Sequence, residues 1–310
     1  MVMYYCTEVF GFPVYQHITE PSTEVPEDLL EMALDDMRRL AASEPLQYVL
    51  GYTEFCGRRF AVDERALIPR AETEVLCQEA EKLVAIAVAG GATPLGSSSF
   101  GLTPPPLRGG PPASVPRVAR PSEGTPSALR VLDLCTGSGC IAWTLALDLP
   151  GAQVVATDLS QDALDLADSQ FRTASGRPSR LPKGALRPRF VKADLLDTEA
   201  TVAAAGEGFD LLTANPPYVM VAEKADMRQN VLGWEPHMAI FAPEEDPLVF
   251  HKAIAEVAMR VLVSGGCGIV EINSEIPDQT AAVFTAAGFE DIRIIPDYFD
   301  RPRFISFRRP

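Results

Sequence analysis

The sequence has few of the residues that build metal sites or disulfide frameworks. It contains only three histidines, and its six cysteines are scattered without a C-x-x-C pair. Zinc sites use closely spaced cysteine and histidine ligands, so we expect no metal site and no disulfide framework. Thiols stay reduced in the cytosol. The cysteine pattern therefore predicts a cytoplasmic protein.

A membrane-spanning run and an excess of basic charge are also missing. No apolar run approaches the roughly 20 residues that cross a bilayer, and residues 1–12 lack the basic flank of a signal peptide. The 27 basic residues are outnumbered by 42 acidic ones, which gives a net charge of -15. Affinity for nucleic acid comes largely from Lys and Arg on phosphates. We expect no membrane association, and the charge disfavours direct binding of nucleic acid.

Residues 1–87 predict a small, mainly helical accessory domain. Residues 1–24 suggest a loop or strand, and apolar residues recur at helical spacing from Leu29 to Leu40. This is the one convincing helix before a short hairpin, which we expect over residues 47–62. A linking helix then runs to about Val88, with Thr73 as its expected N-cap.

Residues 88–128 differ in composition from the rest of the chain. Of these 41 residues, 22 are Gly, Pro or Ser. Such a segment cannot bury enough apolar surface to offset the entropy of ordering it. We therefore expect a flexible linker between the accessory domain and a larger domain, residues 129–310.

The larger domain alternates between predicted strands and helices. Strands are expected at 130–134, 153–157, 189–192, 209–214, 268–273, 291–295 and 304–307, and helices at 138–148, 161–172, 247–263 and 276–287. This alternation predicts an α/β fold with a doubly wound, mostly parallel sheet. Ligands of such sheets bind outside the carboxyl ends of the strands.

A glycine-rich turn follows the first strand of this domain and opens a helix. Its sequence is Asp133-Leu134-Cys135-Thr136-Gly137-Ser138-Gly139. Such a turn lets a ligand approach the backbone and presents free N–H groups at a helix N-terminus. The dinucleotide fingerprint needs a third glycine, but Ala142 stands there. The form D-x-x-x-G-x-G is typical of S-adenosylmethionine enzymes, so we expect Asp133, Cys135, Thr136, Gly137, Ser138 and Gly139 to bind that cofactor.

Two more aspartates follow the next two predicted strands. Asp158 is placed to accept hydrogen bonds from both ribose hydroxyls, and Asp194 from the adenine amino group, with Leu195 against the ring. A cap or turn role would explain any one of these aspartates. Three aspartates at successive strand ends, counting Asp133, favour a cofactor site.

The segment Asn215-Pro216-Pro217-Tyr218 ends the apolar run at 209–214. Residues before prolines are held extended, so the carbonyls here should point in fixed directions. The Asn215 side-chain oxygen and a backbone carbonyl can accept hydrogen bonds from a flat NH2 group, and Tyr218 offers a stacking surface. We expect all four residues to be catalytic and Asn215 also to lie beside the cofactor. A strand ending in a proline turn is the structural alternative.

Taken together, these motifs resemble the N5-glutamine methyltransferases of peptide chain release factors. The glycine-rich turn and the Asn-Pro-Pro-Tyr segment have the family's spacing, and residues 67–74 are similar to its I-P-R-P-[ED]-T-E linker. Trp234-Glu235-Pro236 and the G-x-x-E-F run at 51–55 also match. The resemblance spans about residues 44–308, with two insertions. Cys135 stands where the family has a glycine, and Ala71 where it has a proline.

The resemblance implies methyl transfer from S-adenosylmethionine to the N5 amide nitrogen of a protein glutamine. The expected substrate is the Gly-Gly-Gln loop of release factors, with Asn215 and the Pro216 carbonyl accepting the amide hydrogens. The Asn-Pro-Pro-Tyr segment is shared with N6-adenine methyltransferases, which leaves nucleic acid as an alternative substrate. A glutamine of a ribosomal protein and a non-catalytic binding module are further alternatives.

A basic segment runs from Arg172 to Lys192, with seven basic residues and no acidic ones. On such an acidic chain this segment is a candidate contact for RNA or an acidic partner. A solvated surface loop is the competing interpretation.

Overall fold

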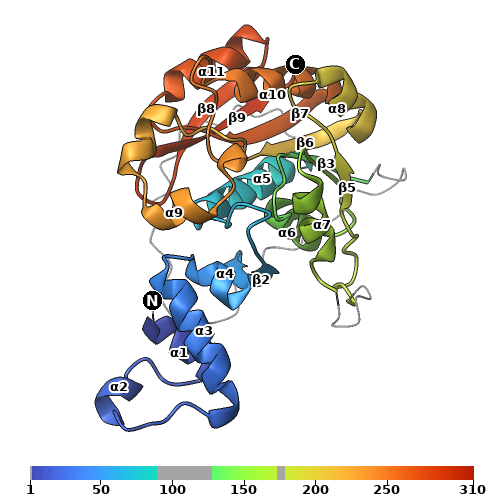
Figure 1. The fold of residues 1–310 in the computed structure, drawn as a ribbon. Coiled ribbons are helices and arrows are strands. Elements are labelled where there is room, and N and C mark those ends of the chain that lie inside the picture. The colour runs from blue at the N-terminus through green and yellow to red at the C-terminus, as the bar shows by residue number, and fades with distance from the viewer. Residues whose placement is uncertain (1, 89–127, 173–178) are drawn as a thin grey trace.

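The computed structural model describes residues 2–88, 128–172 and 179–310. The predicted linker at 88–128 lies almost entirely outside these ranges. Helices α1 to α4 form a lobe below the rest of the molecule (Figure 1). Their bounds, with a short 3₁₀ helix η1, are α1 Val2–Phe10, α2 Gln16–Thr19, η1 Glu27–Leu29, α3 Leu30–Ala41 and α4 Leu46–Leu50.

The N-terminal lobe corrects three predictions. Helix α1 replaces the expected loop or strand, and α3 is therefore not the one helix before the hairpin. The aromatic and β-branched residues of α1 favour strands by themselves, but packing overrides this preference. Tyr5 is fully buried, and its hydroxyl donates to Asp36 of α3. Residues 46–50 are helical, so the hairpin is only β1 (Tyr52–Phe55) and β2 (Arg58–Ala61).

The larger part of the chain folds as predicted, as an α/β structure around one sheet. Its described strands have the order β5-β4-β3-β6-β7-β9-β8, with β9 antiparallel to both β7 and β8. The order reverses at β3, which pairs in parallel with both β4 and β6. The strands are β3 Arg130–Leu134, β4 Gln153–Asp158, β5 Arg189–Lys192, β6 Phe209–Ala214, β7 Leu262–Glu271, β8 Glu290–Pro296 and β9 Pro302–Arg308.

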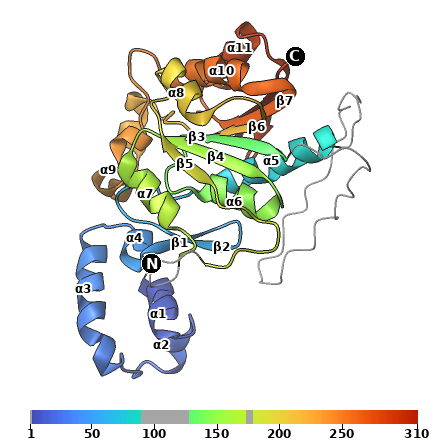
Figure 2. The ribbon, with the colours of Figure 1, turned by 90° about the vertical axis from the view of Figure 1, so that its right-hand side faces the viewer.

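Helices cover both faces of this sheet (Figure 2). Val131 of β3 packs with helices α5 and α6, whereas its neighbour Leu132 packs with α8 and α10 on the opposite face. This alternation is the two-residue period of a strand buried on both faces. The helices of this part are α5 Thr73–Val88, α6 Cys140–Asp148, α7 Gln161–Ser169, α8 Thr198–Ala205, α9 Gln229–Trp234, α10 Val249–Val261 and α11 Pro277–Ala286, with 3₁₀ helices at Val221–Asp226 and His237–Ala239.

Helix α5 packs on the large sheet, although the sequence suggested only a link between domains. Val75, Leu76 and Ala80 of α5 share one buried cluster with residues of β3 and α6. The hairpin also packs on the large sheet, because Phe55 and Phe60 are fully buried in the same cluster. The hairpin and α5 are therefore part of the core on one face of the large sheet.

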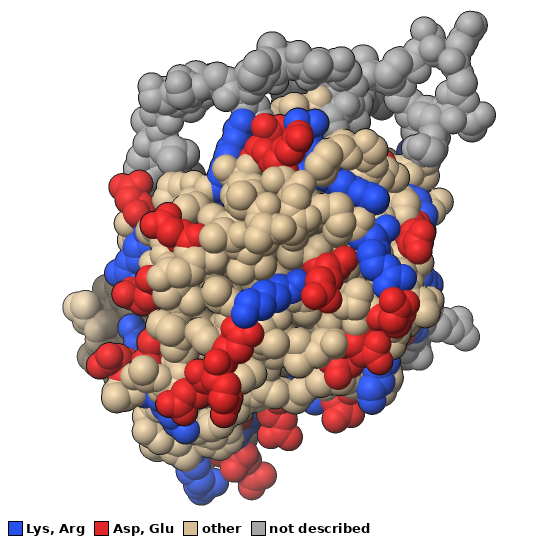
Figure 3. Space-filling view, turned by 90° about the horizontal axis from the view of Figure 1, so that it is seen from above, with Lys and Arg blue, Asp and Glu red and all other residues tan. Residues whose placement is uncertain are grey.

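None of the helices in the described ranges is long and apolar enough to span a membrane. All six cysteines carry free thiols. On the face shown in Figure 3, basic and acidic side chains are interspersed, so the described residues present no broad basic surface there.

Candidate active site

A cavity of about 380 Å³ opens where four strands of the sheet end, at the reversal of strand order. Nine of the predicted site residues line it: Cys135, Thr136, Gly137, Ser138, Asp158, Asp194, Leu195, Asn215 and Pro217. They follow β3, β4, β5 and β6 in turn. Four other predicted residues, Asp133, Gly139, Pro216 and Tyr218, are not part of the lining.

The loop after β3 has three residues in the left-handed region, namely Cys135, Gly137 and Gly139. Cys135 has φ +57° and Gly137 has φ +52°. A non-glycine residue in this region costs about 1–2 kcal/mol, so Cys135 stands where glycine would be unstrained. The Thr136 N–H donates to the Thr157 carbonyl (3.0 Å), which ties the loop to the end of β4.

Gly139 is needed for close helix packing rather than for contact with the cavity. It has φ +79° and directly precedes α6. A Cβ at this position would lie 2.8 Å from Ala167 Cβ of α7, closer than real Cβ atoms approach their neighbours. Gly139 thus lets α6 and α7 meet behind the loop.

Asp133 is fully buried beneath the loop. It accepts hydrogen bonds from the hydroxyls of Thr136 (2.6 Å) and Thr213 (2.7 Å). Burial raises the pKa of its carboxyl to about 7, although both hydrogen bonds oppose the shift. Asp133 therefore joins the loop to β6 and does not face the cavity.

Asp158 and Asp194 bring carboxyl groups to the cavity. Asp158 accepts the N–H groups of Gly137 (2.8 Å) and Ser160 (2.9 Å), one on each oxygen. A carboxylate offers about four acceptor positions, so two remain for a ligand. Burial raises the pKa of the Asp158 carboxyl. Asp194 accepts the Leu196 N–H (3.0 Å) through one oxygen.

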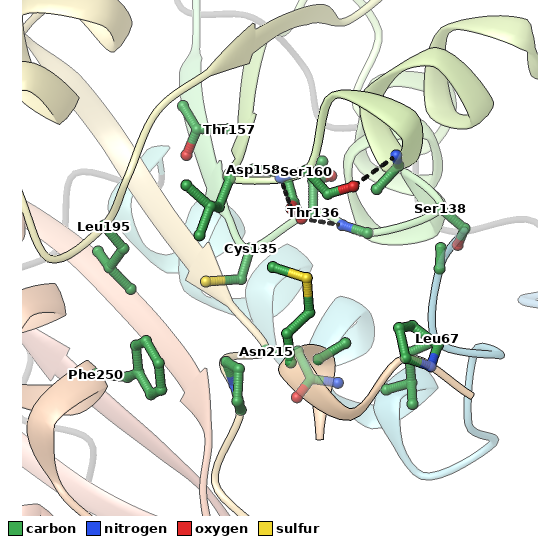
Figure 4. Close-up of a pocket in the computed structure, with 18 of the residues that line it drawn as sticks. Leu67, Cys135, Thr136, Ser138, Thr157, Asp158, Ser160, Leu195, Asn215 and Phe250 are labelled. Atoms are coloured by element: carbon green, nitrogen blue, oxygen red, sulfur yellow. Dashed lines mark hydrogen bonds between the residues drawn. The ribbon is translucent and has the colours of Figure 1, made fainter. Parts of the chain in front are cut away.

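Apolar side chains complete the cavity. Leu195 and Phe250 lie on one side and Leu67 on the other, and the Cys135 thiol points into the space between them (Figure 4). A cavity with apolar walls and few polar groups is typical of a small-molecule site. The sequence reasoning did not predict Leu67 or Phe250 as lining residues. For Leu67 a signal was present, since it belongs to the linker motif.

Polar contacts behind the Asn215 segment reach distant parts of the chain. Asn215 Nδ2 donates to Thr73 Oγ1 of α5 (3.4 Å), and Thr73 donates in turn to Glu271 Oε2 at the end of β7 (2.8 Å). Helix α5 begins at Thr73. Thr73 is thus its first residue and not the N-cap residue that the sequence suggested. The Tyr218 hydroxyl donates to Glu271 Oε1 (2.7 Å). Burial and the nearby Glu271 raise the pKa of this hydroxyl.

Glu235 fixes the linker motif at the rim of the cavity. Only 4% of Glu235 is exposed. Its two oxygens accept the Ile68 N–H (3.0 Å) and Arg70 Nη2 (2.7 Å). Arg70 and Pro236 both line the cavity. The two motifs that carried the family resemblance, residues 67–74 and 234–236, thus contact each other directly.

Two arginines of the basic segment at 172–192 make contacts within the protein itself. Arg187 Nη2 donates to the Asp168 carbonyl (3.1 Å), and its guanidinium lies 4.7 Å from the centre of the Trp143 ring. Arg189 Nη2 donates to the Ala205 carbonyl at the end of α8 (2.8 Å). These contacts favour a structural role for both arginines over contact with RNA.

Several known proteins with similar sequences are described as release factor glutamine methyltransferases. A release factor glutamine methyltransferase of Bacteroides thetaiotaomicron is 33% identical over 271 residues, which are 87% of this chain and 78% of that protein. One of Chlorobaculum tepidum is 36% identical over 271 residues, 87% of this chain and 76% of the relative.

This chain belongs to the release factor glutamine methyltransferase family. No family model matches it. Among solved structures, a release-factor-specific protein-(glutamine-N5) methyltransferase of Alicyclobacillus acidocaldarius is similar with 21% identity and a TM-score of 0.38, over 81% of this chain and 99% of that one. As a member of this family, the chain is a methyltransferase, and the cavity at the strand ends is its candidate active site.

Proposed function

We propose that this enzyme methylates the side-chain amide nitrogen, N5, of a glutamine in a peptide chain release factor, with S-adenosylmethionine as methyl donor. The observation that carries the proposal is the cavity itself, in which Asn215 and Pro217 lie beside Asp158, Asp194 and the loop after β3. Membership of the family supports the same reaction.

The residues that line the cavity suit this cofactor. The open acceptor positions of Asp158 match two ribose hydroxyls, and Asp194 with Leu195 matches an adenine edge and face. The loop after β3 leads into the N-terminus of α6, whose positive end suits the carboxylate of the cofactor. S-Adenosylmethionine, when bound, supplies an electrophilic methyl group on sulfur. We call this half of the cavity the cofactor side.

Asn215 and the proline segment form the other half, which we call the acceptor side. A glutamine amide is a weak nucleophile because its nitrogen lone pair is delocalised into the carbonyl. In our proposal, Asn215 Oδ1 and the Pro216 carbonyl accept the two amide hydrogens and direct the nitrogen lone pair toward the methyl group. The new carbon–nitrogen bond would form as the methyl–sulfur bond breaks, and the nitrogen would lose one of its two hydrogens to solvent as a proton. Fixing two reactants in line can supply about 7–11 kcal/mol of the barrier, so positioning carries most of the catalysis.

We further propose that the lobe of α1 to α4, within residues 1–87, contacts the release factor. Residues 88–128 then connect α5 to the first strand of the methyltransferase domain at 129–310, and the enzyme works in the cytosol. The lobe of α1 to α4 projects from the rest of the molecule (Figure 1), which supports a contact role for it. The six scattered cysteines, with no C-x-x-C pair, favour a reducing compartment.

Mass spectrometry of the acceptor tests the reaction. The enzyme and S-adenosylmethionine are incubated with a release factor that carries a Gly-Gly-Gln loop, and with DNA, RNA and ribosomal proteins in parallel. We expect one added methyl group on the loop glutamine. Label in adenine or in a ribosomal protein instead would replace the proposed substrate, and cofactor binding without any transfer would refute the proposed reaction for these acceptors.

A further inference from the structure

Two buried polar residues lie directly behind Asn215. Thr73 is 2% exposed and begins α5, and Glu271 is 1% exposed and ends β7. They come from segments 198 positions apart in the sequence. Burying a polar group without a partner costs about 1–3 kcal/mol, so the contacts that these two side chains make define their role.

Glu271 is connected to both ends of the Asn-Pro-Pro-Tyr segment. At one end the Tyr218 hydroxyl donates directly to its Oε1 (2.7 Å). At the other end the connection runs through Thr73, whose hydroxyl donates to Glu271 Oε2 (2.8 Å) and accepts from Asn215 Nδ2 (3.4 Å). One carboxyl group therefore anchors the whole segment.

The direction of these hydrogen bonds fixes the Asn215 carboxamide. A threonine hydroxyl has a single proton, and Glu271 accepts it. The Thr73 oxygen can then only accept a hydrogen bond from Asn215, so the group that faces it must be the NH2 end. A flipped carboxamide would bring its oxygen against the Thr73 lone pairs. The Asn215 oxygen is thereby left for another partner.

Several groups around Glu271 favour its charged, hydrogen-bond-accepting form. Burial raises the pKa of the Glu271 carboxyl, whereas the hydrogen bonds from Tyr218 and Thr73 and the charge of Arg303 in β9 oppose this rise. Arg303 is itself held by an ion pair with Asp297 (3.4 Å). The cluster thus combines two hydroxyl donors and one guanidinium around a single buried carboxyl group.

We propose that Thr73 and Glu271 are positioning residues for methyl transfer, because they hold the Asn215 carboxamide with its oxygen available to the amide hydrogens of the acceptor glutamine. This inference rests on the proposed function of Asn215. Thr73 of the linker motif thereby receives a role, and helix α5 is connected to the Asn-Pro-Pro-Tyr segment.

Two substitutions of Thr73 distinguish the effect of its hydroxyl group from the effect of its side-chain size. Thr73→Val keeps the shape and removes the hydroxyl, so the carboxamide loses its directional partner. We expect kcat to fall about 10- to 100-fold, as for small misplacements of a reacting group, while the Kd of S-adenosylmethionine stays within about threefold. Thr73→Ser keeps the hydroxyl and should retain kcat within about threefold. Thr280→Val removes an equally buried hydroxyl from α11 and should leave kcat unchanged.

A second measurement does not depend on activity. The Asn215 side-chain NH2 signals in a ¹⁵N NMR spectrum are identified by their loss in Asn215→Asp. They should lie at the same shifts in the unmodified protein and in Thr73→Ser, and move in Thr73→Val. Full kcat in Thr73→Val, an equal loss in Thr73→Ser, or unmoved signals would overturn the proposed role. If the unmodified enzyme methylates no release factor, the proposed function fails, and the NMR comparison still decides the orientation.

Discussion

The cofactor side and the acceptor side of the cavity are held in place by different kinds of contact. On the cofactor side, the contacts of the loop are mostly near in sequence: Asp158 binds Gly137 and Ser160, and Asp133 binds Thr136, although Asp133 also reaches Thr213, 80 positions away. On the acceptor side, Asn215 and Tyr218 reach partners 142 and 53 positions away. Local loop geometry therefore shapes one half, and packing of α5 and β7 shapes the other.

This difference has a mechanistic meaning. A cofactor with fixed chemistry can be held by strand-end loops whose form follows from a short motif. The acceptor amide must instead be aimed, and aiming requires that Asn215 itself be held by rigid neighbours. The buried Thr73 and Glu271 supply those neighbours. We therefore expect substitutions on the two sides to affect different measured quantities.

Asn215→Ala should have the largest effect and should act on the acceptor side alone. Loss of the carboxamide removes an acceptor that aims the glutamine nitrogen, so we expect kcat to fall about 100- to 1000-fold, the cost of removing one preorganised hydrogen-bonding group. Cofactor affinity, measured by calorimetry, should stay within about threefold. The control is Asn230→Ala in α9. Retained turnover in Asn215→Ala would contradict the acceptor role.

Asp133→Asn should change how stability depends on pH. The unfolded carboxyl releases its proton near pH 4, whereas the buried one keeps it to about pH 7. The stability contributed by Asp133 therefore falls as pH rises between these values. Asparagine does not ionise, so the variant should gain up to about 4 kcal/mol relative to the unmodified protein from pH 4 to pH 8. Urea unfolding across this range measures it.

The matched control for this pH series is Asp226→Asn, which changes an exposed aspartate. Its stability difference from the unmodified protein should stay nearly constant with pH. A constant difference for Asp133→Asn as well would show that this carboxyl ionises normally in the folded protein.

Asp158→Asn should act on the cofactor side. Hydrogen bonds to a charged group contribute about 1.5–3 kcal/mol, so we expect the Kd of S-adenosylmethionine to rise about 10- to 100-fold. At saturating cofactor, kcat should change little, because the acceptor side is intact. Asp162→Asn, an exposed change on α7, should leave the Kd unaltered. If Asp158→Asn lowered kcat without weakening the binding of S-adenosylmethionine, the cofactor side and the acceptor side would not be functionally distinct.

Cys135→Gly should have the smallest effect and should be favourable. Glycine adopts φ +57° without strain, so we expect a gain in stability of about 1 kcal/mol, seen as a higher Tm. The same change at Cys267, which lies in strand β7, should cost about 0.5–1 kcal/mol. Equal effects at both positions would mean that the backbone strain at Cys135 is negligible.

The larger domain could be predicted because its patterns are local. Apolar runs and the alternation of strands and helices gave the α/β fold with a mostly parallel sheet, and the structure confirms it. The lobe was harder, since α1 consists of aromatic and β-branched residues. Contacts such as Tyr5 with Asp36 decide its helical state, and no local pattern contains them.

By itself, the sequence determined that residues at the ends of successive strands meet at the cavity, because parallel strands bring their carboxyl ends to one edge of a sheet. Asp158, Asp194 and Asn215 could be placed there from their spacing alone. Only the tertiary structure decided what holds them. The contact of Asn215 with Thr73 and the contact of Glu235 with Ile68 join segments 142 and 167 positions apart. The contact of Asn215 with Thr73 forms only once α5 packs on the sheet. Sequence periodicity carries no information about either contact.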